Sequence, residues 1–293
     1  MPIDVPFVRS MLFVPANKTH WVEKGIAAGA DAVVLDLEDA VSSDDKELAR
    51  ASVEAFMGEV GTLSTSLFVR INDLSSERSL RDLEAVVSAG LTGVMLPKVQ
   101  SRDDVVILDR MLGWLERARG LDEGGIRILP VMETANGIRH ALSIAQSSAR
   151  VAYMGGLGVK GGDVERSIGY RWSPEGMETL VIRSNVLLDS RAASIPNPLT
   201  GLWSDVRDLD GLREFATQSR NLGYEGMLAI HPSHVAIINE VFTPTATELA
   251  RDEQLVHAME QAALRGDGAT TLEGEMIDEA MAVTARNRLA KFK

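Results

Sequence analysis

The chain has 293 residues, of which 45% are hydrophobic, so it can bury a large core, and one main domain is expected because α/β barrels run to about 250 residues. The net charge of −12 at pH 7 disfavours a nucleic acid or an anionic membrane as partner, since both require a basic surface, but it does not exclude an anionic small ligand met by local positive charge. Without cysteine, the chain can form no disulfide, and any metal must bind carboxylates or imidazoles. No apolar run reaches the ~20 residues of a membrane helix and no signal peptide is evident, so we expect a cytoplasmic protein.

Short apolar runs that predict β-strands alternate with helical patterns along most of the chain. The predicted strands are Arg9–Pro15, Ala32–Asp39, Ser66–Asn72, Gly93–Val99, Arg127–Thr134, Arg150–Gly155, Ala192–Ile195 and Met227–Pro232. The seventh is placed before Pro196 and Pro198 because a proline cannot donate to a strand ladder. Helices are predicted over Asn17–Ala28, from about Lys46, Glu77 and Arg102 onward, and up to about Gln146. This alternation favours a closed parallel (β/α)8 TIM barrel, although an open doubly wound sheet would give similar local signals.

Charged side chains gather where these strands end. One strand ends in the three carboxylates of Asp36, Glu38 and Asp39, which a strand buried on both faces tolerates only beside a cation, a proton or a positive substrate. Other predicted strands end in Arg70 and Asn72, in Lys98, in Glu133, and in Ile230 and His231. Because the active site of a (β/α)8 barrel lies at the carboxyl ends of its strands, we expect these side chains to share one site.

The pattern changes after the eighth strand. We predict a helix over Glu248–Leu264, a turn at 265–268 and a final helix over Ile277–Leu289. The chain is therefore divided into a barrel, residues 1–243, and a C-terminal helical extension, residues 244–293. The extension is either a cap over the barrel mouth or an arm that packs onto a neighbouring subunit, and the sequence leaves both open.

Glu133 and Asp163 are candidate metal ligands. Glu133 follows a buried strand directly, and Asp163 ends the glycine-rich loop after the next strand. Adjacent strand ends in a barrel are close enough for two carboxylates to share one Mg²⁺, whose other ligands are usually water and substrate oxygens. The alternative is that each acid caps the helix that follows it.

Seven motifs in order resemble the citrate lyase β-subunit family, which includes the malyl-CoA and citramalyl-CoA lyases within the phosphoenolpyruvate-binding TIM barrels. The motifs are Arg9-Ser10 with Leu12-Phe13-Val14-Pro15, Asp36-Leu37-Glu38-Asp39-Ala40-Val41, Val69-Arg70-Ile71-Asn72, Leu96-Pro97-Lys98, Glu133-Thr134, Asp163-Val164 with Ile168-Gly169, and Ile230-His231-Pro232. The resemblance spans nearly the whole chain. The segment from Gly155 to Asp163 departs from it, being longer than the family pattern.

The resemblance implies a role for each candidate residue. Glu133 and Asp163 would ligate Mg²⁺, and Asp36, Glu38 and Asp39 would hold its waters. Arg70 would contact the substrate's carboxylate or the carbonyl oxygen formed on cleavage. The expected coenzyme A contacts are Phe13, Lys18, Lys24, Ile230 and His231, with Lys18 standing where the family often has arginine. Asp278 resembles an acid that the family delivers into the active site of an adjacent subunit, which implies a homo-oligomer, a trimer by resemblance. Otherwise Asp278 only caps the last helix.

These roles imply a Mg²⁺-dependent carbon–carbon lyase that cleaves or forms a 3-hydroxyacyl-CoA, such as malyl-CoA, citramalyl-CoA or hydroxymethylglutaryl-CoA, through an enolate. One alternative is a class II aldolase on free 2-oxo acids, which would not need Lys18 and Lys24. Another is a citrate lyase β-type subunit that depends on an acyl-carrier protein. The extension favours a stand-alone enzyme, because carrier-dependent relatives are expected to be shorter there.

Three further features have less specific interpretations. The acidic run Asp44-Asp45-Lys46-Glu47 is interpreted as a solvated helix start, since acids in a first turn complement the helix dipole. Trp203, among prolines near the seventh strand, is expected to pack. Lys98 either contacts a substrate anion or balances the acids around it.

Overall fold

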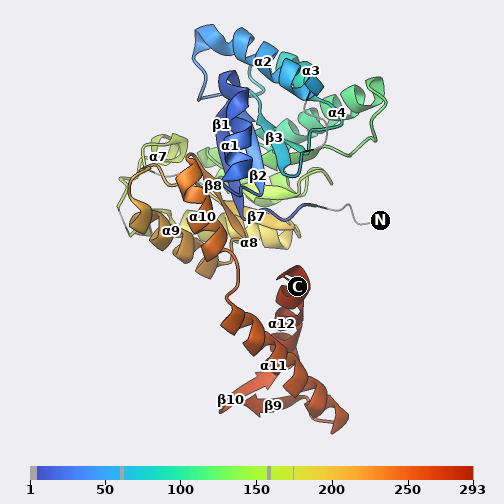
Figure 1. Cartoon of the computed structure of the whole chain (residues 1–293), viewed down its shortest axis with the longest axis vertical. Coiled ribbons are helices and arrows are strands. Elements are labelled where there is room, and N and C mark those ends of the chain that lie inside the picture. The colour runs from blue at the N-terminus through green and yellow to red at the C-terminus, as the bar shows by residue number, and fades with distance from the viewer. Residues whose placement is uncertain (1–4, 60–62, 157–159, 174, 293) are drawn as a thin grey trace. The chain divides into compact units, whose positions relative to one another are not determined.

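The computed structural model describes residues 5–59, 63–156, 160–173 and 175–292 of the chain. The chain forms two compact units, Met1–Phe242 and Thr243–Lys293, and each is described by itself (Figure 1). None of the described helices combines the length and the apolar composition needed to cross a membrane.

The first unit is built on a parallel sheet of eight strands in the order β5-β4-β3-β2-β1-β8-β7-β6. The strands are β1 Ser10–Pro15, β2 Ala32–Asp36, β3 Ser66–Arg70, β4 Gly93–Leu96, β5 Arg127–Pro130, β6 Tyr153–Gly155, β7 Asn197–Thr200 and β8 Gly226–Ala229. Parallel bridges join Ile128 to Val151 and Val131 to Gly155, and thereby bring the two edges of the sheet together. The predicted TIM barrel is confirmed.

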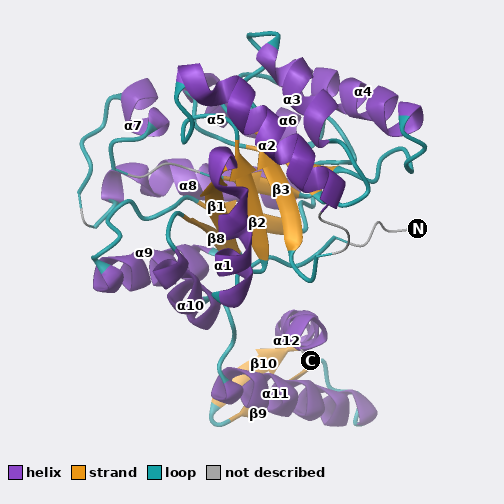
Figure 2. Cartoon of the chain, turned by 45° about the horizontal axis from the view of Figure 1, so that its top comes forward, coloured by secondary structure: helices purple, strands orange, loops and turns teal. Residues whose placement is uncertain are grey.

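Helices surround the strands (Figure 2). They are η1 Ala16–Trp21, α1 Val22–Ala27, η2 Ser43–Asp45, α2 Lys46–Glu59, α3 Arg78–Val86, α4 Arg102–Ala118, α5 Ala135–Arg139, α6 Ala141–Ala145, α7 Asp163–Ile168, α8 Met177–Ala192, α9 Leu209–Leu222 and α10 Pro232–Val241. One apolar cluster lies between strands and helices, and a smaller one fills the barrel interior.

The alternation of side chains along each strand explains why charged groups meet at the barrel mouth. Val34, Phe68 and Leu129 belong to the interior cluster. Successive residues of a strand point to opposite faces, so a residue two positions further on points the same way. Asp36 and Arg70 therefore continue the inward rows of β2 and β3.

The predicted position of the seventh strand is wrong: residues 192–195 lie at the end of α8 and in the following turn, and β7 is Asn197–Thr200. The prolines do not prevent the strand, because β7 pairs with β8 only from Leu199 onward, opposite Gly226. The nitrogen of Pro198 precedes that paired stretch, while its carbonyl oxygen still accepts a hydrogen bond from the Glu225 N–H. On the β6 side Pro198 lies opposite Met154, but the hydrogen bonds there are made by Asn197 and Leu199, so the proline removes no ladder bond.

The second unit consists of α11 Ala246–Leu264, the antiparallel strands β9 Ala269–Leu272 and β10 Glu275–Asp278, and α12 Glu279–Phe292. The prediction of a final helix from Ile277 is wrong at its start, because Ile277 and Asp278 belong to β10. The sequence analysis missed this hairpin. Its two-residue turn, Glu273-Gly274, has φ of 53° and 87°, the left-handed pair typical of a tight hairpin turn.

Candidate active site

Asp36 and Arg70 form the base of the candidate site. They are paired in register as the last residues of β2 and β3, and the guanidinium grips the carboxylate with two hydrogen bonds, Nε to Oδ1 at 2.7 Å and Nη2 to Oδ2 at 2.6 Å. Burial tends to lower the Arg70 pKa, but the hydrogen bonds and charge of Asp36 outweigh it and raise the pKa. Asp36 also accepts the main-chain N–H groups of Glu38 and Ala40, so its carboxylate holds the loop that follows β2.

Glu38 and Asp39 are bridged to the next strands by two cations. The Arg70 Nη1 lies 3.2 Å from Glu38 Oε2, and the Lys98 ammonium contacts Glu38 Oε1 and lies 3.4 Å from Asp39 Oδ1. Burial raises the pKa of Glu38 despite the opposing charges of Arg70 and Lys98. Asp39 is more exposed, and although burial tends to raise its pKa, Lys98 and Arg70 hold that pKa below its usual range. Carboxylates and cations therefore alternate across the ends of β2, β3 and β4.

Glu133 and Asp163 line one cavity of about 380 Å³, together with Lys98 and Arg166. Glu133 is 8% exposed, and its Oε1 accepts the Lys98 main-chain N–H at 2.7 Å. Neither acid caps the helix after it, contrary to the alternative drawn from the sequence: the Thr134 side chain caps α5, and Asp163 is the first residue of α7, where its carboxylate contacts the Arg166 guanidinium. The long loop after β6 includes residues outside the described part of the chain, but Asp163 still reaches the cavity that Glu133 lines.

The two acids suit a divalent cation. Burial raises the pKa of Glu133 to about 7, and the carboxylates of Asp163 and Glu38 add to the rise while the Lys98 N–H and Arg70 oppose it. A buried carboxylate with acidic neighbours is stabilised as the anion by a bound cation. Within the described ranges no group of three or more acids or histidines is placed to hold a metal ion. Mg²⁺ is commonly bound by one or two carboxylates, with water and substrate oxygens as its other ligands.

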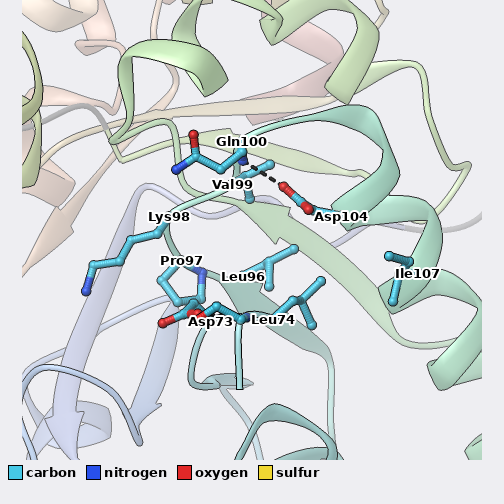
Figure 3. A pocket seen from close by; sticks show the side chains of 10 residues that line it. Asp73, Leu74, Leu96, Pro97, Lys98, Val99, Gln100, Asp104 and Ile107 are labelled. Atoms are coloured by element: carbon cyan, nitrogen blue, oxygen red, sulfur yellow. Dashed lines mark hydrogen bonds between the residues drawn. The ribbon is translucent and has the colours of Figure 1, made fainter. Parts of the chain in front are cut away.

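Lys98 links this cavity to a second one beside it. Its backbone has φ of 52°, a left-handed conformation that is unusual for a residue other than glycine. The second cavity, about 420 Å³, lies between Asp73–Ser75, the end of β4 and the first turns of α4. Figure 3 shows Leu74, Leu96 and Ile107 in this pocket, with the Lys98 side chain extending away from Asp104 and Ile107. With this backbone conformation, the Lys98 N–H donates to Glu133 and the Lys98 ammonium contacts Glu38.

The candidate coenzyme A residues near the N-terminus form two small groups. The Lys18 and Lys24 ammonium groups lie 4.3 and 5.2 Å from the ring centroid of Trp21, so the indole holds two positive charges close together. The Phe13 ring lies 4.8 Å from the Arg70 guanidinium. The structure thus brings Lys18 and Lys24 together through Trp21, which the sequence analysis missed.

Ile230 and His231 follow β8 directly and are exposed. The His231 Nδ1 accepts the Ser233 N–H at 3.2 Å and lies 2.7 Å from its hydroxyl, so the imidazole caps α10. Asp278 lies in the second unit, where its Oδ1 accepts the Met281 N–H at 3.1 Å. That contact fits the helix-capping interpretation and leaves its proposed catalytic role a prediction.

The interpretation of residues 44–47 as a solvated helix start is wrong for Lys46. Its neighbours Asp44, Asp45 and Glu47 are exposed as a solvated helix start requires, but Lys46 itself is only 8% exposed. Its ammonium donates to the main-chain oxygens of the loop after β2. Because Lys46 lies in an uninterrupted polar run, the sequence gave no sign that its side chain is buried. Trp203, in contrast, packs as expected against Trp172 and Phe215, with ring centroids 5.9 and 5.8 Å apart.

Curated relatives match nearly the full length of the chain. The citrate lyase β subunit of Haemophilus influenzae is 31% identical over 285 residues, which cover 97% of both chains. The (3S)-malyl-CoA thioesterase of Cereibacter sphaeroides is 30% identical over 286 residues, covering 98% of this chain and 94% of that one. Since a citrate lyase β subunit spans the same length, the expectation that carrier-dependent relatives are shorter at the C-terminus is wrong.

A solved structure shares the fold. The protein CitE from Mycobacterium tuberculosis, in complex with magnesium, acetoacetate and coenzyme A, superposes with a TM-score of 0.76 at 26% identity, covering 97% of this chain and 98% of that one. Residues 9–232 match the HpcH/HpaI aldolase/citrate lyase family. The matched range includes every barrel strand and all the candidate residues of the barrel mouth. The chain therefore belongs to the HpcH/HpaI aldolase/citrate lyase family and is an enzyme.

Proposed function

We propose that the enzyme is a Mg²⁺-dependent carbon–carbon lyase that acts on a 3-hydroxyacyl-CoA thioester. The observation that carries the proposal is the cavity shared by Glu133 and Asp163, bordered by the Lys98 cation. The CitE complex with magnesium, acetoacetate and coenzyme A supports the same combination of metal, short oxo acid and thioester carrier.

Glu133 and Asp163 would hold the Mg²⁺, with Asp36, Glu38 and Asp39 orienting its waters. When bound, the ion would supply Lewis-acid stabilisation of negative charge on the substrate's oxygen atoms. The Lys98 N–H fixes Glu133 at 2.7 Å, so the carboxylate is oriented before substrate arrives. Such preorganisation reduces the reorganisation needed during the reaction.

Arg70 would bind the planar carboxylate of the substrate's oxo-acid half. Its guanidinium is already held by Asp36 and Glu38 and lies over the Phe13 ring, so its orientation is fixed from three sides. Cleavage breaks the bond between C2 and C3 of the acyl group, and the electron pair moves onto the thioester as an enolate. The hydroxyl proton leaves with a base, and an acid returns a proton to the enolate carbon, a role proposed for Asp278 from a neighbouring subunit.

Lys18 and Lys24 would attract the phosphates of coenzyme A, and Phe13, Ile230 and His231 would contact the rest of the carrier. The two ammonium groups around Trp21 give local positive charge on a chain whose net charge is −12. A homo-oligomer, with a trimer as the resemblance suggests, would let Asp278 reach a second barrel.

A second candidate function is hydrolysis of the thioester, because a relative named (3S)-malyl-CoA thioesterase is as similar as the citrate lyase β subunit. Carrier-protein-dependent action as a citrate lyase β-type subunit and aldol cleavage of free 2-oxo acids remain alternatives. Free coenzyme A should bind the lyase and the thioesterase but not a class II aldolase.

The test is to incubate the purified protein and Mg²⁺ with malyl-CoA, citramalyl-CoA and hydroxymethylglutaryl-CoA, and to separate the products by liquid chromatography. A lyase releases acetyl-CoA from each thioester, together with glyoxylate, pyruvate or acetoacetate respectively, whereas a thioesterase releases free coenzyme A and the intact hydroxy acid. If all three thioesters persist while the same acyl group on a carrier protein is cleaved, the subunit function replaces the proposal.

A further inference from the structure

We propose that Lys46 is a positioning residue, which acts from behind the loop after β2 to hold Glu38 against Arg70 and against Lys98, the cation that borders the metal cavity. This inference rests on the proposed function. Lys46 is the first residue of α2 and is 8% exposed, so its ammonium is largely removed from water. A buried amine is costly unless donors and acceptors are well paired, so its partners matter.

The partners of Lys46 are two main-chain carbonyl oxygens rather than a carboxylate. Its Nζ donates to the Leu37 carbonyl at 2.7 Å and also to the Glu38 carbonyl. These two carbonyls belong to consecutive residues of the loop that bears Glu38. One side chain thus fixes the backbone from which the Glu38 carboxylate extends toward Arg70 and Lys98.

A second buried group holds the same loop. The Asn72 Nδ2 also donates to the Leu37 carbonyl, at 3.2 Å, so that oxygen has two donors. The Asp82 Oδ2 fixes Asn72 by accepting its main-chain N–H at 2.8 Å and its Nδ2 at 2.6 Å, and the Asp82 Oδ1 accepts the Arg50 Nε at 2.8 Å. Helices α2 and α3 therefore anchor the loop through buried polar contacts, and Lys46 donates directly to its main chain.

A purely electrostatic role and a positioning role predict opposite changes in the affinity for a divalent cation. Loss of a positive charge near the carboxylates would by itself tighten binding of a divalent cation. Loss of positioning would instead weaken it, because groups that orient a metal's ligands and waters typically change affinity or activity on the order of 10-fold to 100-fold. The sign of the change in affinity therefore separates the two effects.

The experiment compares the full-length wild type with Lys46→Met and uses Mn²⁺ binding, followed by electron paramagnetic resonance, as a readout independent of turnover. We expect Lys46→Met to weaken Mn²⁺ binding on the order of 10-fold and to lower kcat by a similar factor on the thioester that the wild type cleaves. Unchanged or tighter Mn²⁺ binding would overturn the inference.

Arg150→Met is the matched control. Arg150 is 4% exposed and bonds Glu116 and the Ile126 carbonyl at the opposite end of the strands, so its loss removes an equally buried cation far from the metal cavity. We expect it to lower Tm at least as much as Lys46→Met while leaving Mn²⁺ affinity and kcat within about twofold of the wild type. An equal loss of Mn²⁺ affinity in the control would assign the Lys46 effect to general destabilisation and overturn the inference.

If Lys46→Met does not fold, Asn72→Ala tests the same loop by removing the other donor to the Leu37 carbonyl. Weaker Mn²⁺ binding supports the inference, and unchanged binding contradicts it. A wild type that binds no Mn²⁺ or cleaves no thioester counts against the proposed function itself. A wild type that does both, with the Lys46 variant unaffected, counts against the positioning role alone.

Discussion

Replacing Arg70 by lysine keeps one positive charge at the barrel mouth but removes the planar fork. The wild-type guanidinium makes two bonds to Asp36, at 2.7 and 2.6 Å, and reaches Glu38 at 3.2 Å. A lysine ammonium cannot reproduce this parallel pair and at the same time offer further N–H groups in a fixed plane to a substrate carboxylate. Arg70→Lys therefore isolates geometry from charge.

The structure sets the expected magnitudes. The Arg70 and Asp36 side chains are 13% and 1% exposed, so at least one charge-assisted hydrogen bond is lost in a buried setting, worth about 2 kcal/mol of folding stability. If the N–H groups of Arg70 that Asp36 does not occupy bind charge that develops on the substrate, kcat should fall about 100-fold, equivalent to ~2.7 kcal/mol. The assay is release of the shorter acyl-CoA at saturating substrate and Mg²⁺, with Tm measured in the same buffer.

Arg9→Lys is the matched control for this variant. Arg9 grips Asp31 with the same fork, both bonds 2.8 Å long, but at the amino ends of β1 and β2. Its side chain is 29% exposed, and we expect a loss of about 1 kcal/mol in stability and no change in kcat. If Arg70→Lys keeps kcat within about threefold of the wild type, or if Arg9→Lys lowers it equally, the assignment of Arg70 to substrate binding is refuted.

Three further predictions follow from the acids. The folded-state pKa of Glu133 is raised to about 7 from 4.5, so its contribution to stability is full below about pH 4.5 and is lost as the pH rises through 7. In the presence of a metal chelator, Glu133→Gln should therefore be more stable than the wild type by about 3 kcal/mol at pH 8 and equal to it near pH 4. Equal stability of the two proteins at both pH values, measured by urea unfolding, would contradict this. Mg²⁺ at 100 times its Kd should raise the unfolding free energy of the wild type by about 2.7 kcal/mol relative to the protein in chelator, and calorimetry should show no such gain for Asp163→Asn. If the variant is still stabilised by Mg²⁺, Asp163 is not a metal ligand. Asp278→Asn keeps the cap to the Met281 N–H, so Tm should not change, whereas kcat should fall on the order of 100-fold if Asp278 transfers a proton; unchanged kcat would leave it a helix cap only.

Features that depend on the local alternation of apolar and polar residues could be predicted from the sequence. Asp36, Arg70 and Glu133 could be placed at one mouth because each directly continues a short apolar run at the carboxyl end of a parallel strand. The β7 strand was misplaced because its prolines were judged without knowledge of which neighbour each residue pairs with. Proline is compatible with a strand wherever the partner strand has not yet begun, and only the register shows where that is.

Features set by tertiary contacts could not be predicted. Lys46 lies in a strongly polar run, and its burial depends on how α2 lies against the loop after β2. The link from Lys98 through its N–H to Glu133 depends on a left-handed backbone that no local pattern signals. The hairpin β9–β10 had a weak signal, two threonines before Glu273-Gly274, which was outweighed by the helical pattern that follows.

The backbone at Lys98 restricts which residues can replace it. Glycine would adopt φ of 52° without steric cost but has no ammonium to reach Glu38, while arginine or glutamine would keep a polar side chain and incur the same cost. No standard amino acid offers both conformational ease and a cation at this point. A variant library at position 98 should therefore yield few proteins that keep both the thermal stability and the turnover of the wild type, since relief of the backbone strain leaves Glu38 without its ammonium partner.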